Sequence, residues 1–426
     1  MSRNLVRTIR LPQAVALYVA AVIGAGVLIL PGLAATKAGP ASVLAWSFDC
    51  LLGIPLALTF AALASRYPDA GGVATFTSKA FGPGLGAAVG WFYFLATATG
   101  HIIVPLTGAY YIADALRLGR GETFVVAAAI LLLAAVANVR GLRVSGTLAL
   151  LLSAGVALLL MAAALIAIPR MQVSKWIPFA PHGFGVVGQT AVLIFFAFFG
   201  WEAIAQLSAE FQHPERDLLR STLWSVGLVT LLYLGVAVAT IGTGTYGTPA
   251  VDAVAVARLL SDSLGTGVGG IAAVMAFIIA LGTTNAFMAA TSRLGYALAR
   301  DGAFPAWLEP LNRQGVPTRV ILLVSAYALG GFALVYVVGW RAETLLFIPN
   351  SLGIATFIVG TAAGVRLLKG KGRWLAAVSF LLCIAVFVFA GASVSLPMGV
   401  ALAAFAYRRL RRREKQREET SDTKSG

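Results

Sequence analysis

Long apolar segments alternate with short polar or charged segments along almost the whole chain. Twelve of the apolar segments come close to the length, about 20 residues, that a helix needs to cross a bilayer. The pattern therefore predicts an all-α membrane protein with 12 transmembrane helices. The predicted spans cover residues 12–36, 41–65, 84–116, 122–139, 144–168, 187–211, 219–242, 266–298, 319–338, 344–365, 374–391 and 393–407.

The composition agrees with this assignment. The chain has 426 residues, of which 59% are hydrophobic and only 12% are charged. Soluble domains average about 25% charged residues, so this chain has too few polar side chains to cover a soluble protein of its size. Lipid must therefore cover much of its surface.

The net charge of +15 is distributed unevenly over the predicted loops. Most of the 32 Lys and Arg residues lie in residues 1–11, in the loops that follow even-numbered spans, and in residues 408–426. Because positive charge marks the cytoplasmic side, both termini are expected to be cytoplasmic. The basic tail is expected to be disordered and to attract anionic lipid. No motif for nucleic-acid binding accompanies these residues.

The first span is interrupted by poor helix formers. Its stretch "VIGAGVLILPG", residues 22–32, holds three glycines and a proline. Inside a membrane, unwound backbone survives only where it lines a cavity or meets a polar ligand. The small residues Gly24, Ala25 and Gly26 would let a ligand approach that backbone closely. A kinked helix that serves packing alone is the competing interpretation.

A second interruption is predicted in the sixth span. The stretch "AVLIFFAFFGWEAIAQLSAEF" places Gly200 and Glu202 inside an aromatic run. Because the sixth span begins five helices after the first, with four spans between them, the two interrupted spans cross the membrane in opposite directions. Corresponding broken helices in two inverted halves are typical of secondary transporters with a site at the midplane. The spacing predicts two five-helix repeats, 12–168 and 187–366, with residues 374–407 appended as two extra helices.

Four motifs, in order, resemble the amino acid–polyamine–organocation (APC) superfamily of transporters. "IGAGVLILPG" resembles the glycine motif of the family's first helix, with Ala25 in place of the usual serine. "YPDAGGVATF" with "FGPGLGAAVGW" resembles the loop between helices two and three, and "FFGWEA" resembles the sixth-helix break. "SRLGYALARDGAFP" resembles the segment that leaves helix eight. Within the family, the residues around "FFGWEA" are most similar to the bacterial exporters of L-methionine and branched-chain amino acids.

The resemblance implies a fold and a function. The fold is that of the sodium-coupled leucine transporter (LeuT-like), a 5+5 inverted repeat with discontinuous helices 1 and 6. The function is secondary active transport of neutral, apolar L-amino acids, of the methionine, leucine, isoleucine and valine type, by alternating access in the bacterial inner membrane. Export is the leading direction. A proton- or sodium-coupled importer or exchanger, or a transport-inactive sensor, is the alternative.

Independently of this resemblance, the two breaks suit a zwitterion. Free N–H groups at the start of the second half of helix 1 suit a carboxylate. Carbonyls at the end of the first half of helix 6 suit an ammonium group. The nearby aromatic rings would line an apolar pocket or pack against lipid. The predicted substrate-binding residues are Ile23, Gly24, Ala25, Gly26, Phe196, Phe199, Gly200 and Trp201, with Phe195 as a further candidate.

Four residues are candidates for coupling or gating. Glu202 is ionisable at membrane depth and is expected to carry a proton or to act as a gate. The alternative is that its carboxylate only stabilises the N-terminus of a half-helix. His101 either carries a proton or contacts the substrate; the alternative is a neutral, buried histidine with one hydrogen-bond partner. Thr283 and Thr284 offer hydroxyl oxygens to a sodium ion or to carbonyls of their own helix.

Other residues leave the coupling ion open between H⁺ and Na⁺. Asp49, in the second span, is either functional or paired with a neighbouring helix. The fifth span lacks the lysine that stands in for sodium in some proton-coupled relatives; the matching place falls near Gly155 or Val156. The stretch "EFQHPERD", residues 210–217, is a candidate cytoplasmic gate closed by salt bridges.

No feature of the sequence predicts an enzyme, a cofactor or a metal centre. Only three histidines are present, without an HExxH or GxSxG motif. Cys50 and Cys383 both fall within predicted spans, where they form neither a disulfide framework nor a metal site. The expected partners are the neutral amino-acid substrate and the lipid bilayer.

Overall fold

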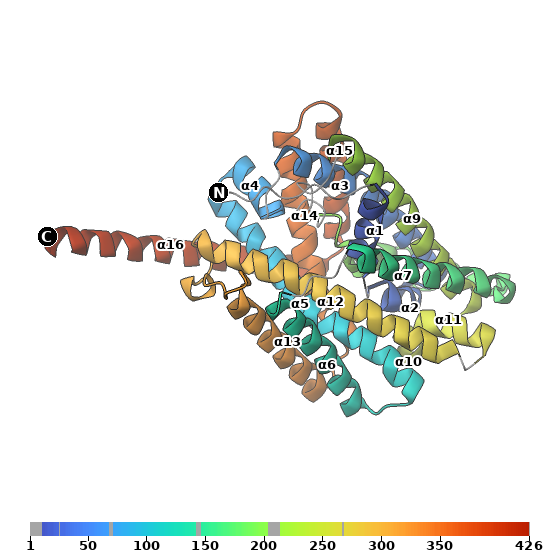
Figure 1. The fold of residues 1–426 in the computed structure, drawn as a ribbon. Coiled ribbons are helices and arrows are strands. Elements are labelled where there is room, and N and C mark those ends of the chain that lie inside the picture. The colour runs from blue at the N-terminus through green and yellow to red at the C-terminus, as the bar shows by residue number, and fades with distance from the viewer. Residues whose placement is uncertain are drawn as a thin grey trace.

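The computed structural model describes residues 11–24, 26–67, 71–141, 146–202, 214–265 and 268–425. Every regular element in these ranges is a helix, and the long helices pack side by side into one bundle (Figure 1). The long elements are α1 (Leu11–Val22), α2 (Gly26–Ala38), α3 (Ser42–Arg66), α5 (Pro83–Leu116), α6 (Arg120–Val139), α7 (Gly146–Ala167), α8 (Gly185–Ile194), α9 (Pro214–Thr243), α12 (Val268–Arg300), α13 (Thr318–Val338), α14 (Phe347–Leu367), α15 (Lys371–Val388) and α16 (Ser395–Ser425).

Eight segments of the described ranges are long and apolar enough to cross a membrane. One of them, Gly26–Arg66, contains both α2 and α3, between which Gly39 adopts a positive φ of 63° and redirects the chain. Two further apolar helices, Ala154–Arg170 and Gly185–Phe198, are shorter. An all-helical membrane protein is therefore confirmed, while the count of twelve spans stays a prediction.

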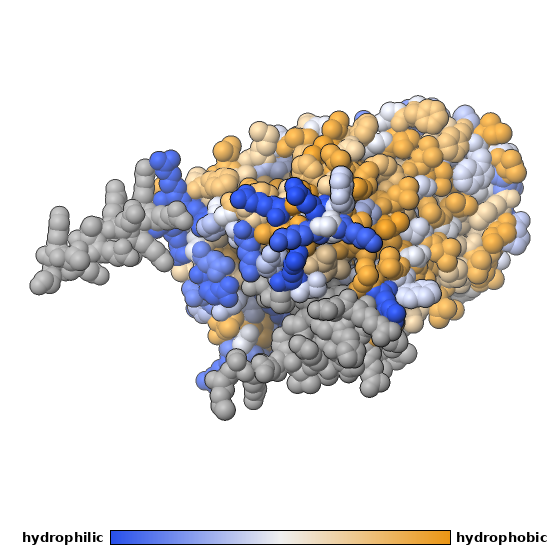
Figure 2. Space-filling view, turned by 90° about the horizontal axis from the view of Figure 1, so that it is seen from above, coloured by the Kyte–Doolittle hydropathy of each residue, from blue (hydrophilic) through white to orange (hydrophobic). Residues whose placement is uncertain are grey.

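Figure 2 shows where the surface is apolar. Hydrophobic residues cover most of the visible face, and hydrophilic residues gather toward the end from which α16 projects. Many large apolar side chains are exposed, among them Leu51, Val125 and Leu402, each more than 60% accessible. Such a surface is stable only against lipid tails.

The first predicted span is divided in two. Helix α1 ends at Val22, helix α2 begins at Gly26, and Ala25 lies outside the described residues. The N–H of Gly24 donates to the carbonyl of Val22 over 2.8 Å, a tight turn that replaces helical hydrogen bonding. The chain therefore leaves the helical path at the glycine stretch, as the sequence pattern predicts.

The sixth predicted span also stops partway. Helix α8 ends at Ile194 and tightens into the 3₁₀ helix η4 (Phe195–Phe198). Phe199 is then extended and Gly200 has a φ of 118°, a conformation open to glycine but strained for other residues. Residues 203–213 lie outside the described ranges, and with them the first half, 210–213, of the predicted gate at 210–217.

Close helix packing depends on small residues at several contacts. A Cβ added at Gly108 of α5 would lie 2.4 Å from the Cβ of Ala280 in α12. A Cβ at Gly331 of α13 would lie 2.2 Å from Ile102 of α5. In lipid, helices associate through such close backbone approach rather than through water exclusion, so these glycines fix the position of α5 at the centre of the bundle.

The structure differs from the sequence pattern in two ways. The tail at 408–426, predicted to be disordered, continues α16 as a helix to Ser425 and projects from the bundle (Figure 1). Its Arg, Lys, Glu and Gln residues are good helix formers, and neither Gly nor Pro interrupts them before position 426. Three short helices, α4 (Val73–Phe81), α10 (Pro249–Asp252) and α11 (Ala255–Leu264), lie in predicted loops.

Candidate functional site

The two helix breaks lie against each other in the bundle. A Cβ added at Gly26, the first residue of α2, would lie 3.2 Å from the ring of Phe196 and 3.4 Å from the Cα of Ala197, both in η4. The absence of a side chain at Gly26 therefore allows the start of α2 to touch the end of the α8–η4 segment.

Tyr233 of α9 connects the two breaks. Its hydroxyl lies 2.9 Å from the carbonyl oxygen of Val22, at the end of α1, and 2.8 Å from that of Ala197 in η4. The side chain is buried, with 1% of its surface exposed. Helix ends leave carbonyls without their helical partners; this phenol supplies a donor to the Ala197 carbonyl and shares the Val22 carbonyl with the N–H of Gly24.

A small enclosed cavity lies at this junction. Its volume of about 10 Å³ is about the minimum for one water molecule. The walls come from α1, α2, α5, η4 and α12, and no charged side chain is among them. The lining residues are Val22, Gly24, Gly26, Val104, Phe196, Ala197, Phe199, Thr283 and Phe287.

Glu202 occupies the far side of the sixth-helix break. Its carboxylate accepts a hydrogen bond from the backbone N–H of Gly200, 3.1 Å from Oε2, and another from the hydroxyl of Tyr93 in α5. Only 4% of its surface is exposed. These bonds hold the acid beside the break and tie the break to α5, so Glu202 is placed to respond when helix 6 moves.

Comparison with known proteins identifies the family. Residues 9–405 match the amino acid permease family. The chain belongs to that family. The permease YecA of Bacillus subtilis is 32% identical over 394 residues, which cover 91% of this chain and 92% of YecA. The L-methionine/branched-chain amino acid exporter YjeH of Escherichia coli is 28% identical over 379 residues, covering 88% and 89%. The branched-chain amino acid permease BcaP of B. subtilis is 29% identical over 322 residues, covering 70% and 68%.

Membership of the amino acid permease family confirms the APC resemblance seen in the motifs. Together with the apolar helices and the bacterial relatives, it establishes an integral inner-membrane transporter of amino acids. The orientation of the termini stays a prediction.

The predicted binding residues of this permease fall into two groups. Gly24, Gly26, Phe196 and Phe199 line the cavity. Ile23, Phe195, Gly200 and Trp201 do not, although all are close to the breaks, and Ala25 lies outside the described residues. The indole of Trp201 packs on Tyr18 of α1, with ring centroids 6.0 Å apart.

Four lining residues were not among the predicted set: Val22, Val104, Ala197 and Phe287. Val22 and Ala197 directly adjoin the predicted breaks, so a wider window around each break would have included them. Val104 and Phe287 lie in the middle of uninterrupted apolar helices, where no local signal separates them from ordinary packing residues.

The other coupling candidates have distinct environments. Thr283 faces the cavity, and Thr284 donates to the carbonyl of Ala280 over 2.6 Å, as a threonine within a helix often does. His101 is fully buried, with Nδ1 2.7 Å from the carbonyl oxygen of Thr97. Within the described residues, no cluster of His, Cys, Asp and Glu is suited to a metal ion.

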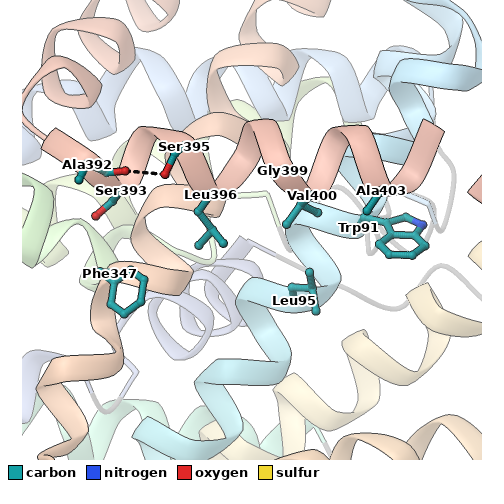
Figure 3. Close-up of a pocket in the computed structure, with 10 residues that line it drawn as sticks. All are labelled: Trp91, Leu95, Phe347, Ala392, Ser393, Ser395, Leu396, Gly399, Val400 and Ala403. Atoms are coloured by element: carbon teal, nitrogen blue, oxygen red, sulfur yellow. Dashed lines mark hydrogen bonds between the residues drawn. The ribbon is translucent and has the colours of Figure 1, made fainter. Parts of the chain in front are cut away.

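A larger groove lies elsewhere, between α5, the start of α14 and α16 (Figure 3). It has a volume of about 660 Å³ and is open and mostly apolar. Its ten lining residues include Trp91, Leu95, Phe347 and Leu396 but no charged side chain and neither helix break. Because the groove contains none of the unwound backbone of the two breaks, which could meet both charged ends of a zwitterion, the junction is the better candidate for an amino-acid site.

Proposed function

We propose that this permease transports neutral, apolar L-amino acids of the methionine, leucine, isoleucine and valine type, and that the junction of the two breaks binds them. The observation that carries the proposal is the lining of the cavity: unwound backbone from α1–α2 and η4, aromatic and aliphatic side chains, and no charge. Such a site offers backbone dipoles to the charged ends of an amino acid and an apolar wall to its side chain.

The polarity of the half-helices determines how the substrate would lie. Helix α2 begins at Gly26 and points its N-terminal N–H groups at the junction, where they favour a carboxylate. The segment α8–η4 ends at Phe198 and points its C-terminal carbonyls there, which favours an ammonium group. Phe196, Phe199 and Phe287 would enclose the side chain, which explains a preference for apolar substrates.

The small volume of the cavity supports alternating access. A space for about one water molecule is too small for leucine or methionine. Aromatic rings on both η4 and α12 must therefore move before substrate enters. In an alternating-access cycle, one half of the bundle rocks against the other to make that space and opens it to one side at a time.

Helix contacts support the five-plus-five inverted repeat that we propose for the fold. In a repeat of this kind, predicted span n corresponds to span n+5. Helices α3 and α9, spans two and seven, pack together, as do α5 and α12, spans three and eight. The contact of α1 with α9 has its counterpart in that of α8 with α3. Discontinuous helices at corresponding places of the two halves complete the pattern.

Export is the direction that we propose. It is supported by the likeness to YjeH, which is an L-methionine/branched-chain amino acid exporter and aligns over most of both chains. The likeness to branched-chain amino acid permeases such as BcaP makes import of the same substrates the competing direction. Both directions use the same site chemistry.

Counterflow in proteoliposomes tests the substrate class. Vesicles are loaded with one unlabelled amino acid at a time, and uptake of labelled leucine is followed at pH 6 and pH 8. We expect acceleration by internal methionine, leucine, isoleucine or valine, and none by arginine or glutamate. A flat response to every neutral amino acid, from protein that elutes as a single folded species, would contradict the proposal.

A further inference from the structure

A second buried acid lies outside the site described above. Asp49 of α3 has no exposed surface, and neither of its carboxyl oxygens accepts a hydrogen bond from any residue in the described part of the chain. The sequence left open a pairing with a neighbouring helix, and the described helices provide no such pair. An ionised carboxylate without partners in a dry interior costs many kcal/mol, so this conformation is compatible with the neutral, protonated acid.

The position of Asp49 along α3 connects it to the sixth-helix break. Trp46, Asp49 and Gly53 follow each other at spacings of three and four residues, which places them on one face of the helix. The ring of Trp46 packs on Phe198 of η4, with centroids 6.4 Å apart. A Cβ added at Gly53 would lie 3.6 Å from Nε1 of Trp201. This face of α3 therefore packs against the break.

Two unused hydrogen-bond donors lie on the same contact. The indole nitrogens of Trp46 and Trp201 are buried, and neither donates to an acceptor among the described residues. Buried polar groups in native proteins are nearly always hydrogen-bonded. Two N–H donors and one carboxyl group without bonds, gathered at one contact, indicate that the contact has a second arrangement in which they pair.

We propose that Asp49 is the binding site of the coupling proton. In the closed conformation the acid is protonated and unpaired. When the sixth-helix break moves to admit substrate, the carboxyl O–H bond breaks and its proton passes to water on the open side. The carboxylate that remains accepts hydrogen bonds from the indole N–H groups of Trp201 and Trp46. Proton release thereby becomes linked to the position of helix 6, because Trp201 belongs to the break and Trp46 packs on it.

The surroundings of Asp49 favour a proton over a sodium ion. Cys50 on the same helix and Cys383 on α15 are close enough to interact electrostatically with the acid, and Tyr233 of α9 packs on Trp46. These three groups are neutral near pH 7. A thiol or an indole N–H offers no oxygen to a hard cation, and the Tyr233 hydroxyl already bonds to the carbonyls of Val22 and Ala197. The charged residues of the helices packed on α3 lie toward the helix ends, at Lys37, Glu215, Arg216, Asp217, Arg220, Arg366, Lys371 and Arg373.

This inference rests on the proposed transport function, so its test measures substrate and protons separately. Proteoliposomes containing a trapped pH-sensitive dye report proton movement when a leucine gradient is imposed. Labelled-leucine counterflow in the same vesicles reports substrate exchange. Asp49→Asn, which keeps the shape of a protonated acid, is compared with the native protein and with Asp262→Asn, an exposed acid near Arg170.

We expect leucine-driven proton movement from the native protein and from Asp262→Asn. For Asp49→Asn we expect proton movement at the level of empty liposomes while leucine counterflow continues. Proton movement by Asp49→Asn at the native rate would overturn the assignment. Leucine counterflow by the native protein without any proton movement would overturn it as well. Absence of counterflow from the native protein would instead reject the proposed function.

Infrared difference spectroscopy tests the protonation of Asp49 without transport. The native protein should show the C=O stretch of a protonated carboxyl group that disappears in Asp49→Asn and persists in Glu202→Gln. Leucine should weaken that band, and Trp201→Phe, which removes the N–H donor, should reduce the effect of leucine. No band difference between the native protein and Asp49→Asn would overturn the proposal whatever the transport result.

Discussion

Glu202 and Asp49 are both buried acids, yet their hydrogen bonding differs completely. Glu202 accepts bonds from the Gly200 N–H and the Tyr93 hydroxyl, whereas Asp49 accepts none from the described residues. A paired carboxylate can stay ionised inside a protein, but an unpaired one cannot without a large cost. The sequence indicates that both residues lie at membrane depth, but hydrogen-bond partners on other helices distinguish them.

Removing the hydroxyl that supports Glu202 should weaken the protein. Tyr93→Phe leaves the buried carboxylate with one donor fewer, which should lower the free energy of unfolding by about 1–3 kcal/mol. Tyr336→Phe is the control, because that ring is 47% exposed and packs against Arg120. Denaturant unfolding in detergent measures both variants. Equal stability of the two variants would show that the Tyr93 bond contributes little.

The position of the Phe199 ring depends on a glycine of another helix. A Cβ added at Gly353 of α14 would lie 1.8 Å from the Phe199 ring, so Gly353→Ala must displace that ring. We expect a loss of about 1–3 kcal/mol in unfolding free energy and slower leucine counterflow. Gly330→Ala on α13, where nothing lies within 4 Å, should leave both unchanged. Native counterflow by Gly353→Ala would argue against Phe199 as a lining residue.

The aromatic run around the sixth-helix break shows why residue-level prediction is incomplete. Phe196, Phe199 and Trp201 look equivalent in the sequence, since all lie within four residues of Gly200. In the structure, the two phenylalanines face the cavity and Trp201 packs on Tyr18 instead. The extended Phe199 and the positive φ of Gly200 determine which way each ring points, and neither conformation can be read from side-chain type.

At the scale of elements, strong local signals were predictable and weak ones were not. The long apolar runs predict the long helices, and the Gly24–Gly26 stretch predicts the break between α1 and α2. The short helices α4, α10 and α11 escaped prediction because 4 to 10 residues carry too little apolar periodicity beside long spans. The tail of α16, residues 408–425, is helical although its polar composition is typical of disorder. The high helix propensity of its Arg, Lys, Glu and Gln residues explains the difference.

Tyr233 is expected to hold the two broken helices together. Tyr233→Phe removes the hydroxyl near the carbonyls of Val22 and Ala197, so the Ala197 carbonyl loses this donor and the Val22 carbonyl keeps only the N–H of Gly24. The free energy of unfolding should fall by about 1–3 kcal/mol, and amide hydrogen exchange should accelerate at Ile23 and Gly24 more than in α13. Equal exchange rates at Ile23 and Gly24 in the native protein and in Tyr233→Phe would contradict this role.

At the scale of the whole molecule, the charge distribution predicts the orientation in the membrane. Lys369 lies between α14 and α15, and Ser174 lies between α7 and α8; both are exposed. The positive-inside pattern places the first in the cytoplasm and the second outside. The native Cys50 and Cys383 are buried, so a cysteine introduced at either position should dominate labelling by a thiol reagent.

A membrane-impermeant maleimide should therefore label Lys369→Cys only in inside-out vesicles, and Ser174→Cys only in intact cells. The reverse pattern would invert the topology and place the termini outside. Labelling of both positions from the same side would show that the number of spans between them is wrong.

Direct binding of labelled leucine to the purified protein tests the central claim, that the unwound backbone at the junction is the substrate site. Gly26→Leu should abolish binding, because its side chain would occupy the space in front of Phe196 and Ala197. Gly330→Leu, in open space on α13, is the matched control. We predict that the native protein and Gly330→Leu bind leucine, that methionine and isoleucine compete, and that folded Gly26→Leu binds none. Native affinity in Gly26→Leu would contradict the account and place the substrate elsewhere.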